Sequence, residues 1–185
     1  MRLLPLFVVS ALVSGVAGPA KSAEIDPAAL GRLEKQILPK LVSAVGELGN
    51  GRTDKALEKF EEVMGRKFAK TTGPFGQDER QVWQKMFTMF PKTPPKFECV
   101  DLIGAQAVSS QAFKITVVAN GRQGPILFQF RIFEYRGKFR LVSVHFDNNW
   151  QRVEAVVAAI RQKHFKRYSL PVEQTAEKSG KAKSK

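Results

Sequence analysis

Two short turns that contain glycine constrain the fold of this chain more than any other feature. Asn120-Gly121 and Arg136-Gly137 each separate two segments in which apolar and polar side chains alternate. Alternation with a period of two residues is typical of β-strands, and such dipeptides favour tight hairpin turns. The expected strands span residues 97–103, 112–119, 126–135 and 138–146. Four strands joined by short links predict an antiparallel meander.

The chain before these strands has the three- and four-residue apolar spacing of amphipathic helices. Asp26 followed by Pro27 predicts a helix start, because an aspartate side chain caps a helix and proline fits its first turn. Pro39 should kink or split this helix, which ends at Asn50-Gly51. Further helices are expected over residues 53–68, 78–90 and 149–168. The second of these should bury Val82, Met86 and either Phe87 or Phe90. The predicted fold class is therefore α+β: N-terminal helices packed on a curved, cone-like antiparallel four-stranded meander, followed by a C-terminal helix.

Residues 1–23 have the three parts of a secretory signal peptide. Met1-Arg2 is basic, residues 3–16 are uncharged and almost wholly apolar, and residues 17–23 are mostly small. A membrane anchor is the alternative, but the apolar run is shorter than the roughly 20 residues that a spanning helix needs. We therefore expect cleavage within residues 17–23 and an exported protein, either periplasmic or secreted.

The remaining chain is expected to form one domain and a tail. Residues 24–168 should form a single α+β cone-like domain, in which the lone Cys99 is a small buried side chain and cannot form an internal disulfide. Residues 169–185 should form a basic disordered tail, because residues 178–185 contain only lysine, glycine, serine and alanine. This tail either contacts an anionic envelope surface or serves only solubility. Its lysines are Lys178, Lys181, Lys183 and Lys185.

The usual chemical motifs are absent from the sequence. It has no glycine-rich phosphate loop, no nucleophile elbow around a serine and no metal-ligand spacing, since His145 and His164 lie far apart with no cysteine or paired carboxylate beside them. The aromatic residues have core spacing rather than the interleaved basic and aromatic pattern of a single-strand binder. We therefore expect no catalytic residue, no metal, no cofactor and no specific nucleic acid.

One group of residues predicts a ligand pocket. With a two-residue loop at Arg136-Gly137, pairing along the last two strands places Phe128 opposite His145. The same register places Phe130 opposite Ser143, on the more apolar face that should meet the helices. A few polar groups beside an apolar wall are typical of small-ligand pockets, although a hydrogen-bonded, inert core histidine is the alternative. The candidate pocket residues are Phe128, Phe130, Ser143, His145 and Asp147.

Two stretches of the chain resemble the nuclear transport factor 2-like superfamily of cone-shaped α+β domains. GRTDKALEKFEEVM (Gly51–Met64) is similar to the helix that opens many such domains, and YRGKFRLVSVHFDNNW (Tyr135–Trp150) is similar to their last hairpin. The resemblance covers roughly Gly51–Trp150 and is closest to small exported members of uncharacterised role. A long helix follows the sheet where many members end, and the acid/base dyad of the superfamily's enzymes is not recognisable. The resemblance therefore implies the fold but no activity.

Three functions follow from these features. The first is an exported, non-catalytic domain that binds a small apolar or amphipathic ligand, or a protein partner, through a cone-shaped pocket. The second is an envelope-associated interaction protein that its basic C-terminal helix and tail tether to anionic surfaces. The third is an enzyme with His145 and Asp147 as an acid/base pair. An open apolar cone favours the first function, and a packed cone favours the second.

Overall fold

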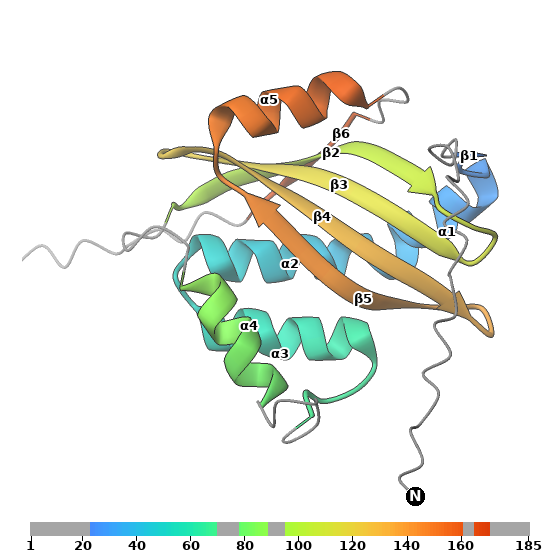
Figure 1. The fold of residues 1–185 in the computed structure, drawn as a ribbon, viewed down its shortest axis with the longest axis horizontal. Coiled ribbons are helices and arrows are strands. Elements are labelled where there is room, and N and C mark those ends of the chain that lie inside the picture. The colour runs from blue at the N-terminus through green and yellow to red at the C-terminus, as the bar shows by residue number, and fades with distance from the viewer. Residues whose placement is uncertain (1–22, 70–77, 89–94, 161–164, 171–185) are drawn as a thin grey trace, which may run out of the picture.

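The computed structural model describes residues 23–69, 78–88, 95–160 and 165–170. The architecture is α+β, with N-terminal helices, then an antiparallel meander sheet, then a C-terminal helix (Figure 1), which confirms the predicted fold class. The helices are α1 (Pro27–Gln36), α2 (Leu38–Gly49), α3 (Thr53–Met64), α4 (Glu79–Phe87) and α5 (Trp150–Ala159). The strands are β1 (Ala23–Glu24), β2 (Phe97–Ala107), β3 (Ala112–Gly121), β4 (Gly124–Tyr135), β5 (Lys138–Asp147) and β6 (Lys166–Ser169). The expected signal peptide (residues 1–23) and the expected tail (residues 169–185) lie outside the described residues, except for Ala23, Ser169 and Leu170.

The first two helices form as the capping residues and prolines predict. The Asp26 carboxylate accepts a hydrogen bond from the backbone N of Ala28 at 3.3 Å, and Pro27 occupies the first helical position. The helix is split at Ile37, and Pro39 lies in the first turn of α2, where its missing N–H costs nothing.

Helix α4 buries the predicted aromatic residue Phe87, and Met86 packs partly buried against the same core, but the predicted Val82 does not turn inward. Phe87 is buried and stacks on Phe60 of α3 and on Phe146 of β5, each with ring centroids 5.8 Å apart. Val82 is exposed, so the expectation that it is buried is wrong. The large apolar area of the rings outweighs that of one valine in setting which face of α4 turns inward.

Strands β2 to β5 form the predicted meander, and β1 and β6 both pair with β2. The expected helix that continues to Tyr168 is wrong, because α5 ends at Ala159 and the chain returns as β6. The Arg167 guanidinium donates to the Asp101 carboxylate at 2.8 Å, and Tyr168 packs against the main core. Strand β6 also gives backbone partners to an edge of β2 that would otherwise be open.

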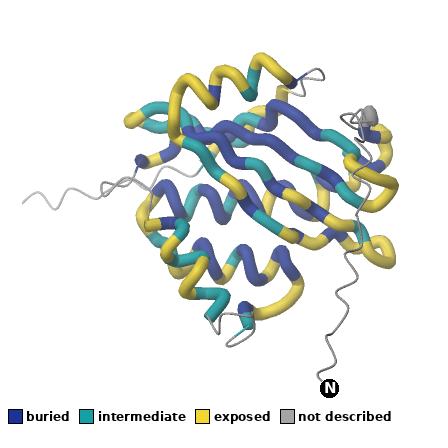
Figure 2. Tube along the Cα trace, in the orientation of Figure 1, coloured by how far each residue is buried: buried dark blue, intermediate teal, exposed yellow. Residues whose placement is uncertain are grey.

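The sheet separates two apolar layers. Its inner face shares the main core with α1 to α4, and its outer face is partly covered by α5 (Figure 1). The inner side chains of the central strands are Phe113, Ile115, Val117, Ile126, Phe128, Phe130 and Ile132. The outer layer beneath α5 consists of Ile103, Val118, Leu127, Val153 and Ile160. Figure 2 shows how continuous the buried part of the sheet is.

A bulge in β5 changes the expected register. Ile132 pairs with Leu141, but the next pair is Arg131 with Ser143, so Val142 is an extra residue. Beyond the bulge, Gln129 rather than Phe128 is opposite His145. The predicted pairs between the turn and Leu141 are confirmed, but the pairs of Phe130 with Ser143 and of Phe128 with His145 are wrong, because one inserted residue moves every later side chain to the other face.

The physical reason for the bulge lies in what each register would bury. Without it, Ser143, His145 and Asp147 would face the core. With it, Val144 and Phe146 face inward instead, and Val144 is buried while Phe146 packs against the core. Burying apolar groups is favourable, whereas burying polar groups without partners costs free energy.

Candidate functional site

The structure divides the five predicted pocket residues between the two faces of the sheet. Phe128 and Phe130 are fully buried on the inner face, where their rings stack with centroids 6.2 Å apart. Phe97 packs edge-on against Phe128 at 6.2 Å, so this part of the core is filled by aromatic rings. Ser143 and His145 lie instead on the outer face.

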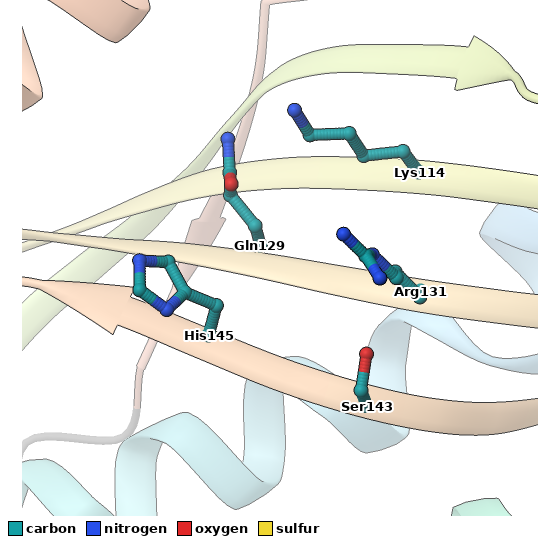
Figure 3. A pocket seen from close by; sticks show the side chains of 5 residues that line it. All are labelled: Lys114, Gln129, Arg131, Ser143 and His145. Carbon is teal, nitrogen blue, oxygen red and sulfur yellow. The ribbon is translucent and has the colours of Figure 1, made fainter. Parts of the chain in front are cut away.

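A hollow of about 420 Å³ lies on the uncovered part of the outer face. It is lined by Lys114 of β3, Gln129 and Arg131 of β4, and Ser143 and His145 of β5. Figure 3 shows these side chains on the same side of the three strands. The volume lies in the range of small-ligand sites.

The register builds this site from two cross-strand rows. Lys114 is opposite Arg131, which is in turn opposite Ser143. In the next row, Gln129 is opposite His145. Because side chains of direct cross-strand partners on one face lie about 5 Å apart at Cβ, the register itself gathers the five polar side chains.

The hollow is basic. Within the described residues its lining includes no carboxylate, and no ion pair involves Lys114 or Arg131. Two like charges directly opposite each other destabilise a sheet. The lining offers ammonium, guanidinium, amide and hydroxyl hydrogen-bond donors, which suit an acceptor-rich anion.

Asp147 lies at the end of β5 and acts on α5 rather than on the hollow. Its carboxylate accepts a hydrogen bond from the backbone N of Asn149 at 2.8 Å and lies 3.7 Å from the Arg152 guanidinium. Across the described part of the chain, no hydrogen bond joins the Asp147 carboxylate to His145. The arrangement supports the start of α5.

A second, apolar hollow of about 270 Å³ lies between α5 and the outer face. Its lining includes the exposed rings of Trp150 and Phe165 and the acidic side chains of Asp101 and Glu154. Asp101 is held by Arg167, so the charged rim of this hollow is partly neutralised.

Sequence reasoning missed three of the five lining residues, Lys114, Gln129 and Arg131. Side chains alternate along β4, and this alternation already predicts Gln129 and Arg131 on the face opposite Phe128 and Phe130. The signal that could have found the site is the apolar spacing of β5, which changes phase between Leu141 and Val144 and thereby indicates a bulge.

The described residues include no group of three or more histidine, cysteine, aspartate or glutamate side chains that could hold a metal ion. Within the same ranges, no helix is both long and apolar enough to cross a membrane. Comparison of the chain with protein-family models, with curated proteins and with solved structures found no match.

Proposed function

We propose that this protein is an exported, non-catalytic binding domain whose outer-face hollow holds an anionic group such as a phosphate, a sulfate or a carboxylate. The observation that carries the proposal is the direct pairing of Lys114 with Arg131 in a hollow whose described lining has no carboxylate. A bound anion would offset the repulsion between the two cations and accept hydrogen bonds from both.

The filled inner face supports the outer site over a ligand in the cone. A ligand between the helices and the sheet would need space where Phe128 and Phe130 are fully buried. The sequence feature that favours export is the leader-like stretch of residues 1–23. Attachment to an anionic envelope surface through Lys178, Lys181, Lys183 and Lys185 stays a prediction, because these residues lie outside the described ranges.

Membership of the nuclear transport factor 2-like superfamily is part of this proposal. The order of elements supports it, since helices precede an antiparallel meander. Helix α5 and strand β6, which follow the sheet, are the parts of the chain that depart from that pattern.

Calorimetric titration with inorganic phosphate at low salt tests the anion site. Arg131→Gln and Lys114→Gln should each lower the affinity about ten-fold or more, because a hydrogen bond to a charged group contributes roughly 1.5–3 kcal/mol. Arg122→Gln is the matched control, since Arg122 is exposed in the turn between β3 and β4. Equal losses in all three variants would show a general charge effect and would contradict the proposed site.

The second hollow supports a second candidate function, the binding of an apolar or amphipathic ligand beneath α5. Its apolar lining and the exposed Trp150 ring favour it. Binding of a fluorescent fatty acid analogue, followed by its fluorescence, tests this candidate. Val153→Asn places a polar side chain in this hollow and should weaken the binding, whereas Arg131→Gln should leave it unchanged.

A further inference from the structure

The end of the sheet that carries the β4–β5 turn exposes an unusual amount of apolar surface. Among the described residues, seven large hydrophobic side chains are exposed, and four of them lie at this end. Their exposed fractions are 67% for Val108, 37% for Phe133, 50% for Tyr135 and 60% for Val142. Scattered single apolar residues are ordinary, but a cluster marks an interaction surface.

The backbone brings these residues together from two hairpins. The N–H of Glu134 donates to the carbonyl of Gln111 at 2.7 Å, so the β2–β3 turn lies beside β4. Phe133 and Tyr135 are two residues apart on the outer face of β4. Both turns lie at the same end of the sheet in Figure 1, and Figure 2 shows the β4–β5 turn as exposed.

The same end is strongly basic. Residues 131–140 contain four basic side chains and one acidic side chain, Glu134. The Glu134 carboxylate is bound by Arg32 of α1 at 3.1 Å. The Arg136 guanidinium lies 5.1 Å from the centre of the Tyr135 ring, so a cation and an aromatic ring sit together at the turn. The basic residues are Arg131, Arg136, Lys138 and Arg140.

We propose that this end of the sheet, defined by Val108, Phe133, Tyr135, Val142, Arg136 and Lys138, docks on the surface of an anionic lipid membrane. Tyrosine and other aromatic rings favour the headgroup level of a bilayer, and basic residues are attracted to anionic lipids. The charge of the turn is complementary to such a surface. The inference goes beyond the proposed anion site, because these six residues do not line the hollow.

A lipid surface explains this end better than a protein strand added to the sheet. Strand β5 is the edge strand next to β4, and an added strand would need a regular row of backbone groups along it. The bulge at Val142 interrupts that row. A membrane needs no such register and accepts exposed side chains from both hairpins.

Co-flotation of the purified protein, with its C-terminal tail intact, tests the proposal. The vesicles contain phosphatidylcholine with or without phosphatidylglycerol. We expect binding only to the vesicles with phosphatidylglycerol, and loss of that binding at high salt, where the Debye length falls to about 3 Å at 1 M. Arg136→Gln should weaken binding about five-fold, in line with the contribution of one basic residue near an anionic membrane.

Matched variants separate docking from general charge and apolar effects. Arg122→Gln makes the same change in a turn at the opposite end of the sheet and should bind as the unmodified protein does (Figure 1). Val142→Ser should weaken binding several-fold, whereas Val82→Ser, the same change at an exposed residue of α4, should not.

The proposal is overturned if Arg136→Gln and Val142→Ser float with anionic vesicles as the unmodified protein does. That result would mean that another part of the chain, such as the C-terminal tail, carries the binding. It is likewise overturned if vesicles without phosphatidylglycerol bind equally well. Titration of the same variants with inorganic phosphate distinguishes this failure from failure of the anion site. Arg136→Gln and Val142→Ser should retain their affinity for phosphate, whereas Arg131→Gln should lose it.

Discussion

Lys114 and Arg131 are direct cross-strand partners on the outer face of the sheet. The described lining of the hollow around them has no carboxylate, so the fold holds two like charges side by side. Such a pair lowers the stability of a sheet, and a binding site for an anion gives a reason to keep it.

Removing either charge should therefore stabilise the protein in the absence of an anion. We expect Lys114→Gln and Arg131→Gln each to raise the free energy of unfolding by about 0.2–1 kcal/mol at low salt. Added phosphate should stabilise the unmodified protein more than either variant, because a ligand that binds the folded state adds to its stability. Urea denaturation with and without phosphate measures both effects. A loss of stability in both variants without phosphate would show that these charges have favourable partners.

Much of the fold follows from local features of the sequence. The Asp26-Pro27 start of α1, the split near Pro39 and the turn at Arg136-Gly137 are short-range signals, and the structure confirms them. The turn predicted at Asn120-Gly121 is wrong by two residues, because both residues pair within the sheet and the chain turns at residues 122–123. Strand β6 could not be predicted in this way, because helical spacing around Tyr168 competes with an open edge of β2 that exists only in the folded sheet.

The candidate site was harder to predict, because it depends on one residue. The hairpin from Tyr135 to Leu141 has the expected pairs, and the single extra residue Val142 then reverses the faces. His145 lies in a polar row, as predicted, but on the outer face of the sheet rather than on the helix-covered face.

The aromatic core makes a second stability prediction. Phe128 is fully buried and packs against Phe97 and Phe130. Phe128→Ala should lower the free energy of unfolding by about 3–5 kcal/mol, because it leaves a cavity in a close-packed core. Phe133→Ala makes the same change at an exposed residue of the same strand and should cost much less. Urea denaturation midpoints compare the two, and similar losses would contradict the described packing.

Glu61 makes a third prediction, which concerns pH. Its side chain is buried, which alone would raise the pKa, but hydrogen bonds from the backbone N of Phe68 and from Lys67, each at 2.9 Å, bring the pKa of Glu61 below its usual value of 4.5. A lowered pKa in the folded state means that the carboxylate contributes stability above pH 4.5 and that this contribution is lost as the pH falls toward the folded-state pKa.

Glu61→Gln should therefore lower the free energy of unfolding near neutral pH by about 1–3 kcal/mol, since it weakens hydrogen bonds to a charged group. The difference from the unmodified protein should shrink as the pH falls below 4.5. Glu58→Gln is the control, because Glu58 is an exposed residue of the same helix. Denaturation curves over a pH series measure the effect. A difference that stays constant through the acid range would show that ionisation of Glu61 plays no part.

The last prediction tests the bulge itself. Leu141 and Ser143 pair with successive residues of β4, so Val142 is the extra residue between two regular stretches of β5. Deleting Val142 joins these stretches without changing either register, so Ser143 stays on the outer face and Val144 stays in the core. Because only an exposed residue is lost, the deletion should cost about 1 kcal/mol or less and lower the melting midpoint by about 2–4 °C. Deleting Val144 instead removes a buried side chain, and the shortened strand then turns Ser143 toward the core. A buried polar group without a partner costs about 1–3 kcal/mol, and the apolar burial of the valine is lost as well, so this variant should melt at a much lower temperature. Circular dichroism melts compare the two deletions. A Val142 deletion that melts as low as the Val144 deletion would contradict the described bulge.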